Sequence, residues 1–150
     1  MPAGRSRTTK VPLAAVRRWP TVPWMRAAPA LVAIVDDEES VRRALGRLVR
    51  MAGFDVQTFA SGADFLHSLG RTSPQCVVLD LHMPRMSGFD VQSALVEARA
   101  NVPVIIITGD DSAEIRQQTL TRGAKAYLRK PVDEAMLLDA IQSAIAIAAN

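Results

Sequence analysis

The stretch that decides the fold is LVAIVDDEE at residues 31–39, in which five apolar residues are followed by four acidic ones. A short, continuous apolar run of this kind is typical of a strand that is covered on both faces. Three further predicted strands also end at a polar residue: Asp80, Thr108 and Lys130. This recurring pattern predicts a sheet of buried strands with the candidate functional side chains at the carboxyl ends of the strands.

Segments with helical spacing separate these strands. We expect strands at residues 31–35, 54–60, 76–79, 102–107 and 126–129, and helices at residues 41–52, 61–69, 88–100, 112–122 and 133–149. Parallel neighbours need crossover connections, and intervening helices supply them. The alternation therefore predicts an α/β fold with a doubly wound, five-stranded parallel sheet and right-handed crossovers.

Three of the predicted helices have surfaces that bear on function. Arg42, Arg43, Arg47 and Arg50 lie opposite the apolar side of helix 41–52, which predicts a solvated face. Helix 112–122 has only a thin apolar stripe: Ile115, Thr119 and Leu120. In helix 133–149 we expect an inward face made of Leu137, Ile141, Ile145 and Ala148. The outer side would carry an apolar strip that could serve a homodimer, made of Met136, Ala140 and Ile147.

Composition divides the 150-residue chain into a tail and one domain. Residues 1–29 hold five prolines and six cations but no acid, which predicts a disordered basic extension. The remaining residues carry 12 cations and 15 acids, so the body is mildly acidic although the whole chain is basic. A single cysteine, Cys76, excludes an internal disulfide, and no apolar run approaches the length of a membrane span.

Three carboxylates end two of the predicted strands: Asp36, Asp37 and Asp80. Parallel strands end at one edge of a sheet, about 4.8 Å apart, so these groups converge. Converging carboxylates repel one another unless a cation joins them. Magnesium suits a few carboxylates with water and a phosphate oxygen, whereas calcium needs more protein ligands and zinc favours histidine or cysteine. We therefore predict a Mg²⁺ site.

The remaining groups point to phosphoryl chemistry. The chain contains no Gly-rich nucleotide-binding motif and no nucleophile elbow. A carboxylate beside a divalent cation, a lysine and a hydroxyl suits covalent capture of a phosphoryl group on Asp80 as an acyl phosphate. Lys130 and Thr108 would each supply one contact to the phosphoryl oxygens.

Together these motifs resemble the receiver domain of a two-component response regulator. The matching segments are IVDDE at 34–38, LDLHMP at 79–84, MSG at 86–88, IITG at 106–109 and KP at 130–131. The likeness covers residues 30–149, roughly the predicted domain at 30–150. It implies a flavodoxin-like receiver fold with strand order 2-1-3-4-5.

The resemblance also implies a role for each residue of the acidic cluster. Asp80 would accept the phosphoryl group of a kinase phosphohistidine. Asp37 would bind Mg²⁺ directly and Asp36 through water or more loosely, together with Asp80 and the backbone carbonyl of His82. The side chains of His82 and Asp110 occupy positions that in this family tune hydrolysis of the phosphoryl group.

Three further residues would sense the phosphoryl group. Lys130 would pair with its oxygens, aided by a cis peptide before Pro131. Thr108 would swing inward to hydrogen-bond it, and Tyr127 would follow as a packing switch. The face formed by helix 112–122, strand 126–129 and helix 133–149 would be the output surface.

The leading hypothesis is a stand-alone cytoplasmic response regulator, a signalling phosphoacceptor rather than an enzyme. A sensor histidine kinase or phosphotransfer protein would act upstream and an unknown protein target downstream, with no DNA-binding domain after residue 150. Alternative roles are a phosphate sink, a phosphorelay intermediate or a phosphatase with an aspartyl intermediate. The phosphatase would need a second acid where His82 stands. A nucleic-acid adaptor acting through the basic tail is a further alternative.

Overall fold

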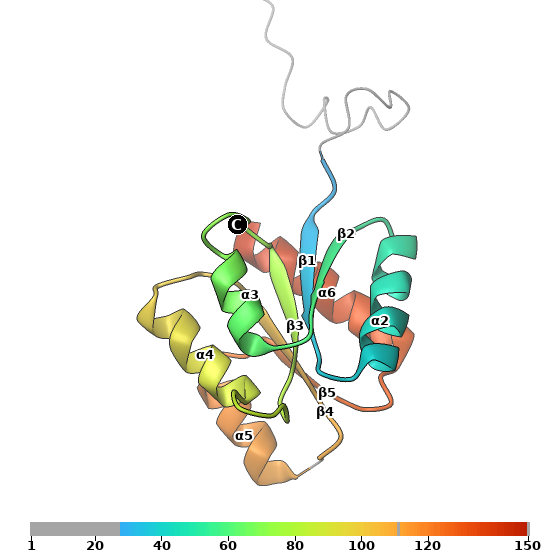
Figure 1. Ribbon diagram of the computed structural model, residues 1–150. Coiled ribbons are helices and arrows are strands. Elements are labelled where there is room, and N and C mark those ends of the chain that lie inside the picture. The colour runs from blue at the N-terminus through green and yellow to red at the C-terminus, as the bar shows by residue number, and fades with distance from the viewer. Residues whose placement is uncertain (1–27, 111, 150) are drawn as a thin grey trace, which may run out of the picture.

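The fold is a five-stranded parallel sheet with helices on both faces (Figure 1). The computed structural model describes residues 28–110 and 112–149. The strands are β1 (Leu31–Val35), β2 (Asp55–Phe59), β3 (Cys76–Asp80), β4 (Val104–Thr108) and β5 (Ala126–Arg129). Their order is β2-β1-β3-β4-β5, and every neighbouring pair is parallel. The predicted architecture and strand order are confirmed.

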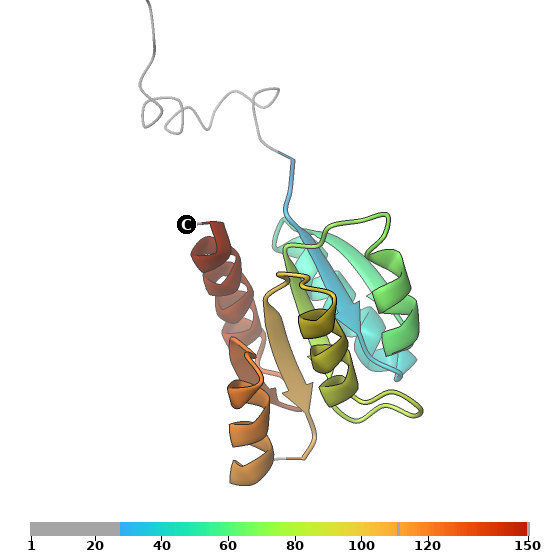
Figure 2. The same ribbon diagram turned by 90° about the vertical axis from the view of Figure 1, so that its left-hand side faces the viewer.

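The helices form one layer on each face of the sheet (Figure 2). They are α2 (Glu39–Met51), α3 (Gly62–Ser68), α4 (Gly88–Glu97), α5 (Ala113–Thr121) and α6 (Glu134–Ala149). Apolar side chains of α2 and α6 pack with one set of strand side chains, and those of α3, α4 and α5 pack with the alternate set. Because both faces are covered, β1, β3 and β4 are buried almost throughout, as their apolar runs predicted.

Serine caps fix where three of the helices begin. Ser61, Ser87 and Ser112 each accept a hydrogen bond from a backbone N–H in the first turn of α3, α4 and α5 respectively. Ser87 and Asp90 form a full capping box. These local contacts hold the start of α4 directly after the loop that follows β3.

Some helix and strand ends differ from the prediction. Helix α4 ends at Glu97 instead of residue 100, because Arg99 adopts a left-handed φ of 55° that an α-helix cannot contain. Strand β4 begins at Val104 instead of residue 102. On α6 the prediction that Ala148 faces inward is wrong, because Ala148 is exposed.

Helix α5 is weakly anchored, as its thin apolar stripe predicted. Thr119 is its only fully buried side chain, Ile115 is partly buried, and Leu120 is 38% exposed. A helix with so little buried apolar area can shift at low energetic cost.

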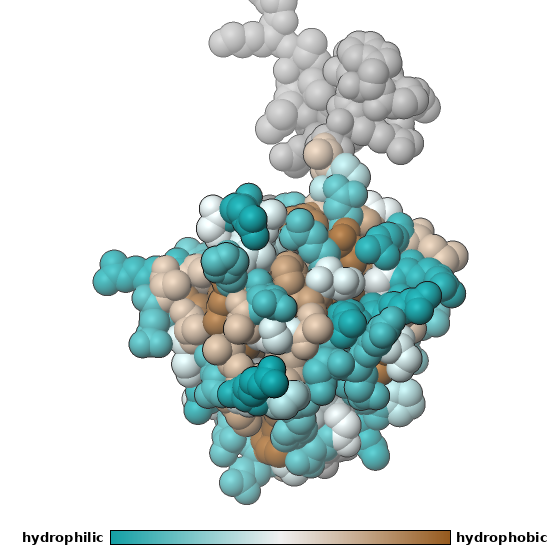
Figure 3. Space-filling model, viewed as in Figure 1, coloured by the Kyte–Doolittle hydropathy of each residue, from teal (hydrophilic) through white to brown (hydrophobic). Residues whose placement is uncertain are grey.

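The surface and the chain ends complete the description. Hydrophilic residues gather over α2 on the face shown in Figure 3, where Arg43, Arg47 and Arg50 are exposed. Of the predicted extension at residues 1–29, residues 1–27 lie outside the described part of the chain. Within the described residues, no helix combines the length and apolar character needed to cross a membrane.

Gly88 allows α4 to approach the end of β3. A Cβ atom at this position would lie 2.8 Å from the carbonyl oxygen of Asp80 and 2.9 Å from the Cα atom of Leu81. Both neighbours are backbone atoms, so either α4 or the end of β3 would have to move.

We therefore expect Gly88→Ala to lower the free energy of unfolding by about 1–3 kcal/mol, despite the better helix propensity of alanine. Gly109→Ala is the matched control, since a Cβ at residue 109 would meet nothing within 4 Å. Urea unfolding of both variants measures the difference. Equal stability of the two variants would contradict the close approach.

Candidate functional site

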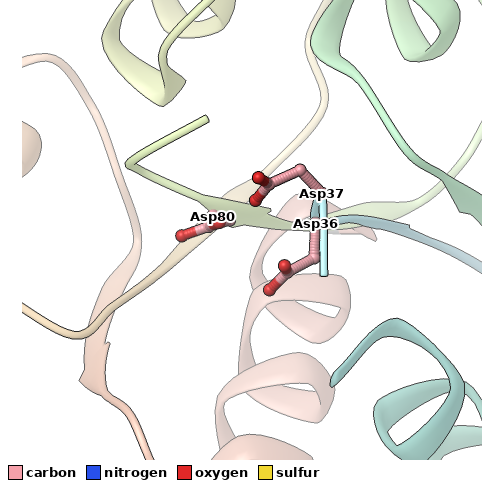
Figure 4. Close-up of side chains that lie close together, drawn as sticks. All are labelled: Asp36, Asp37 and Asp80. Atoms are coloured by element: carbon pink, nitrogen blue, oxygen red, sulfur yellow. The ribbon is translucent and has the colours of Figure 1, made fainter. Parts of the chain in front are cut away.

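The polar residues at the strand ends meet at the carboxyl edge of the sheet. Val35 is paired with Leu79, so Asp36 and Asp37 follow β1 directly beside Asp80 at the end of β3. Carboxylate oxygens of these three residues all lie within 4.8 Å of one another (Figure 4). The structure thus brings together the three carboxylates that the sequence placed at strand ends.

Lys130 joins the buried carboxylates. Its Nζ atom lies 2.9 Å from Oδ2 of Asp36, 3.4 Å from Oδ1 of Asp80 and 3.7 Å from Oε1 of Glu38. The lysine side chain is 16% exposed, and the side chains of Asp36 and Asp80 are almost fully buried. One cation therefore offsets two negative charges that have lost most of their water.

Asp36 is held on several sides, whereas Asp37 faces solvent. The backbone N–H of Asp36 donates to the carbonyl of Phe59 at 3.1 Å, and Oδ1 accepts from the backbone N–H of Glu38 at 2.9 Å. Its Oδ2 has no hydrogen bond of good geometry and is paired with Lys130 through charge. The exposed Asp37 carboxylate lies at the open side of the cluster.

The environment changes the protonation of Asp80 and Lys130. Burial and, second, the negative charge of Asp36 raise the pKa of Asp80 to about 7, although Lys130 opposes the shift. Burial alone would lower the pKa of Lys130, but its contacts with Asp36 and Asp80 outweigh burial and raise the pKa. Asp80 is therefore destabilised as an anion until further positive charge arrives.

A second group of contacts links the site to β5 through Asp110. Oγ1 of buried Thr108 accepts from the backbone N–H of Asp110 at 3.1 Å, and the Tyr127 hydroxyl donates to the Asp110 carbonyl at 2.7 Å. The Asp110 carboxylate lies 3.7 Å from Nε2 of His82. Sequence reasoning named these residues separately but missed this arrangement, because loop hydrogen bonds leave no periodic signal.

The other predicted site residues have the following positions. The His82 backbone N–H is 3.4 Å from Oδ1 of Asp80; the ligand role of its carbonyl oxygen stays a prediction. The peptide bond between Lys130 and Pro131 is cis. Cys76, which was not predicted to belong to the site, is fully buried, and burial raises the pKa of its thiol to about 12.

The donor set fits a hard divalent cation. Asp36, Asp37 and Asp80 offer only carboxylate oxygens, and the buried Oδ2 of Asp36 still lacks a directed hydrogen bond. Such oxygens, with water completing the coordination, are what Mg²⁺ prefers. No histidine or cysteine belongs to this group of described residues, so a zinc-type site does not match.

Comparison with known proteins identifies similar chains. The family model for the response regulator receiver domain matches residues 32–142. The response regulator protein TmoT of Ectopseudomonas mendocina is 37% identical over 124 residues, which are 83% of this chain and 56% of TmoT. The transcriptional regulatory protein FixJ of Rhizobium meliloti is 34% identical over 75% of this chain and 55% of FixJ. The chain thus spans about half the length of these relatives.

Solved structures agree with the sequence comparison. A crystal structure of FixJ-N has a TM-score of 0.74 and 33% identity, covering 79% of this chain and 95% of that one. A response regulator receiver protein from Burkholderia phymatum has a TM-score of 0.70 and 41% identity, covering 78% and 95% respectively.

The raised pKa of Asp80 predicts how stability depends on pH without Mg²⁺. The folded protein keeps the Asp80 proton up to about pH 7, whereas an unfolded carboxyl loses it near its ordinary value of 3.8. The contribution of Asp80 to stability therefore falls between about pH 4 and pH 7. We expect Asp80→Asn to be more stable than wild type by on the order of 2 kcal/mol at pH 8, and by much less at pH 5.

Urea unfolding in a chelating buffer at both pH values measures this difference. Asp139→Asn, an exposed change on α6, should show no such trend. An advantage of Asp80→Asn that shrinks as the pH rises would contradict the assignment.

Proposed function

Because this chain belongs to the response regulator receiver domain family, we propose that Asp80 accepts a phosphoryl group from a sensor histidine kinase or a phosphotransfer protein. The observation that carries the proposal is the position of Lys130 between the Asp36 and Asp80 carboxylates. An acyl phosphate on Asp80 would place its negatively charged phosphoryl oxygens beside the Lys130 ammonium group. The role is that of a signalling phosphoacceptor.

The transfer exchanges one bond to phosphorus for another. An oxygen of Asp80 forms a bond to phosphorus while the bond from phosphorus to the donor histidine nitrogen breaks, and the nitrogen keeps that electron pair. Asp80 must be ionised to attack. Its raised pKa, caused by burial and by the charge of Asp36, disfavours the ionised form, so the reaction needs a bound cation that offsets these effects. Lys130 would then pair with the incoming phosphoryl oxygens.

Mg²⁺ would be held by Asp36, Asp37 and Asp80, with the His82 carbonyl as a further ligand. When bound, the ion supplies positive charge that neutralises the phosphoryl oxygens. The chain itself contributes the fixed geometry. Asp36 is immobilised by its backbone and carboxylate contacts, and exposed Asp37 remains accessible from solvent.

Asp110 would couple phosphorylation to the output surface. If Thr108 turns its hydroxyl toward a phosphoryl group on Asp80, it must give up the bond from the Asp110 N–H. The backbone carbonyl of Asp110 accepts a hydrogen bond from the Tyr127 hydroxyl, and the Asp110 carboxylate faces His82. Movement of this loop would release Tyr127 and the weakly anchored α5. His82 and Asp110, across from one another beside the acceptor, would tune access of water to the phosphoryl group.

Output would pass through the face made by α5, β5 and α6. Its α6 part exposes two large apolar side chains, Met136 at 58% and Ile147 at 64%, which suit a protein target or a phosphorylation-dependent homodimer. A stand-alone regulator, a phosphate sink and a phosphorelay intermediate would all use such contacts. The half-length match to proteins named as transcriptional regulators supports a competing hypothesis, a receiver working within a longer regulator. The mass of the native protein in cell extracts separates a protein of receiver length from a longer regulator.

We expect acetyl phosphate and Mg²⁺ to add one phosphoryl group to the wild-type protein and none to Asp80→Asn. Asparagine is nearly the same size as aspartate but lacks the carboxylate oxygen that attacks phosphorus. Asp139→Asn should be labelled like wild type, since this residue is exposed on α6. Intact-mass measurement reads the result. Equal labelling of Asp80→Asn and wild type would exclude Asp80 as the acceptor.

Lys130→Met should separate metal binding from phosphoryl capture. Loss of Nζ removes a cation within 3.4 Å of two of the metal-binding carboxylates, so Mg²⁺ affinity should rise by about tenfold. Phosphorylation by acetyl phosphate should nevertheless slow by about a hundredfold, because the contact to the phosphoryl oxygens is lost. Calorimetric Mg²⁺ titration and labelling rates measure the two effects. Weaker Mg²⁺ binding together with normal labelling would refute this division of roles.

A further inference from the structure

Arg42 is the one arginine of the predicted solvated face that contacts the site. Its Nη1 atom donates to the backbone carbonyl oxygen of Asp36 at 2.7 Å. Arg43, Arg47 and Arg50 are exposed, whereas Arg42 is partly buried. The prediction of a uniformly solvated face was therefore wrong at Arg42, because its long side chain reaches back from α2 to the end of β1.

The location of Arg42 is electrostatically unfavourable for the helix. Arg42 is the fourth residue of α2, which begins at Glu39. The amino-terminal end of a helix carries partial positive charge, so a cation there is disfavoured. The bond to the Asp36 carbonyl offsets this cost, since hydrogen bonds from charged donors are short and strong.

The Asp36 carbonyl belongs to the peptide that connects the two acids of the cluster. A peptide unit is planar, so fixing its oxygen also fixes the N–H and the Cα atom of Asp37. The other polar atoms of Asp36 contact Phe59, Glu38 and Lys130. Arg42 supplies the remaining contact, the one nearest to Asp37.

We propose that Arg42 is a positioning residue that orients the Asp36–Asp37 peptide and thereby raises the affinity of the acidic cluster for Mg²⁺. This inference rests on the proposed function, in which Asp36 and Asp37 hold the ion. It deepens that function by assigning to α2 a part in metal binding.

Two effects of Arg42 on Mg²⁺ have opposite signs. Its positive charge repels a second cation, so charge alone predicts that removing the side chain tightens Mg²⁺ binding. Its hydrogen bond orients the ligands, so positioning predicts that removal weakens binding. The guanidinium contacts a carbonyl beside the carboxylates, not the carboxylates themselves, so the positioning effect should be the larger one.

Calorimetric titration of the full chain with MgCl₂ tests the proposal. We expect Arg42→Ala to weaken Mg²⁺ affinity roughly tenfold, the lower end of losses seen when a residue that holds a metal ligand is removed. Arg42→Lys keeps the charge but not the fork of donors and should recover part of the affinity. With acetyl phosphate, raising the Mg²⁺ concentration should restore the labelling rate of Arg42→Ala, which a generally damaged protein would not show.

Arg43→Ala is the matched control. It removes the same charge from the adjacent position of α2, where Arg43 is exposed and its ion pair is with Glu39 at 3.7 Å. Its Mg²⁺ affinity should stay within about twofold of wild type, as expected for an exposed charge. Should Arg42→Ala fail to fold, Arg42→Lys decides, with an expected loss of about threefold.

Mg²⁺ binding as tight as wild type, or tighter, in a folded Arg42 variant would overturn the inference while leaving the proposed function intact. Failure of the wild-type protein to bind Mg²⁺ would instead contradict the proposed function itself. An equal loss in Arg43→Ala and Arg42→Ala would show that the effect does not depend on the contact with the Asp36 carbonyl, and would also overturn the inference.

Discussion

The arrangement depends on the contact of Lys130 with two buried carboxylates. Asp36 and Asp80 lie at adjacent strand ends because β1 and β3 are neighbours in the sheet, and burial removes the water that would separate their charges. Without Lys130 at 2.9 and 3.4 Å, folding would leave both charges unpaired in a region of low dielectric. Burial and, second, the charge of Asp36 raise the pKa of Asp80, and Lys130 offsets these two effects only in part. The fold therefore holds an acceptor that gains stability from each further positive charge.

Much of this could be predicted from the sequence, because strand burial and strand ends are local signals. The apolar runs of β1, β3 and β4 are nearly continuous, so their position and the polar residues after them followed directly. The strand order came from the family resemblance, since periodicity does not say which strands are neighbours. Helix ends were less accurate where a single backbone angle decides, as at Arg99.

Contacts made by long or loop-borne side chains could not be predicted. In the sequence, Arg42 cannot be told apart from the exposed arginines of α2. Its contact with the Asp36 carbonyl depends on how the backbone between β1 and α2 is folded. The three contacts of Asp110 with Thr108, Tyr127 and His82 likewise depend on the shape of one loop. The sequence shows Arg42 and Asp110 themselves, but not their partners, which lie on other elements or in irregular backbone.

Two cationic side chains contact Asp36, and the effect of each on metal binding depends on which atom of Asp36 it contacts, not only on its charge. Lys130 contacts the Asp36 carboxylate, so its positive charge lies where a metal ion would also bind. Arg42 contacts the carbonyl of the same residue, where its charge is directed at backbone and its hydrogen bonds set orientation. Under the roles proposed for them, these two positive side chains on one residue would have opposite consequences for a third cation. The division is possible because the carboxylate and the backbone carbonyl of Asp36 are separate groups, each with its own cationic partner.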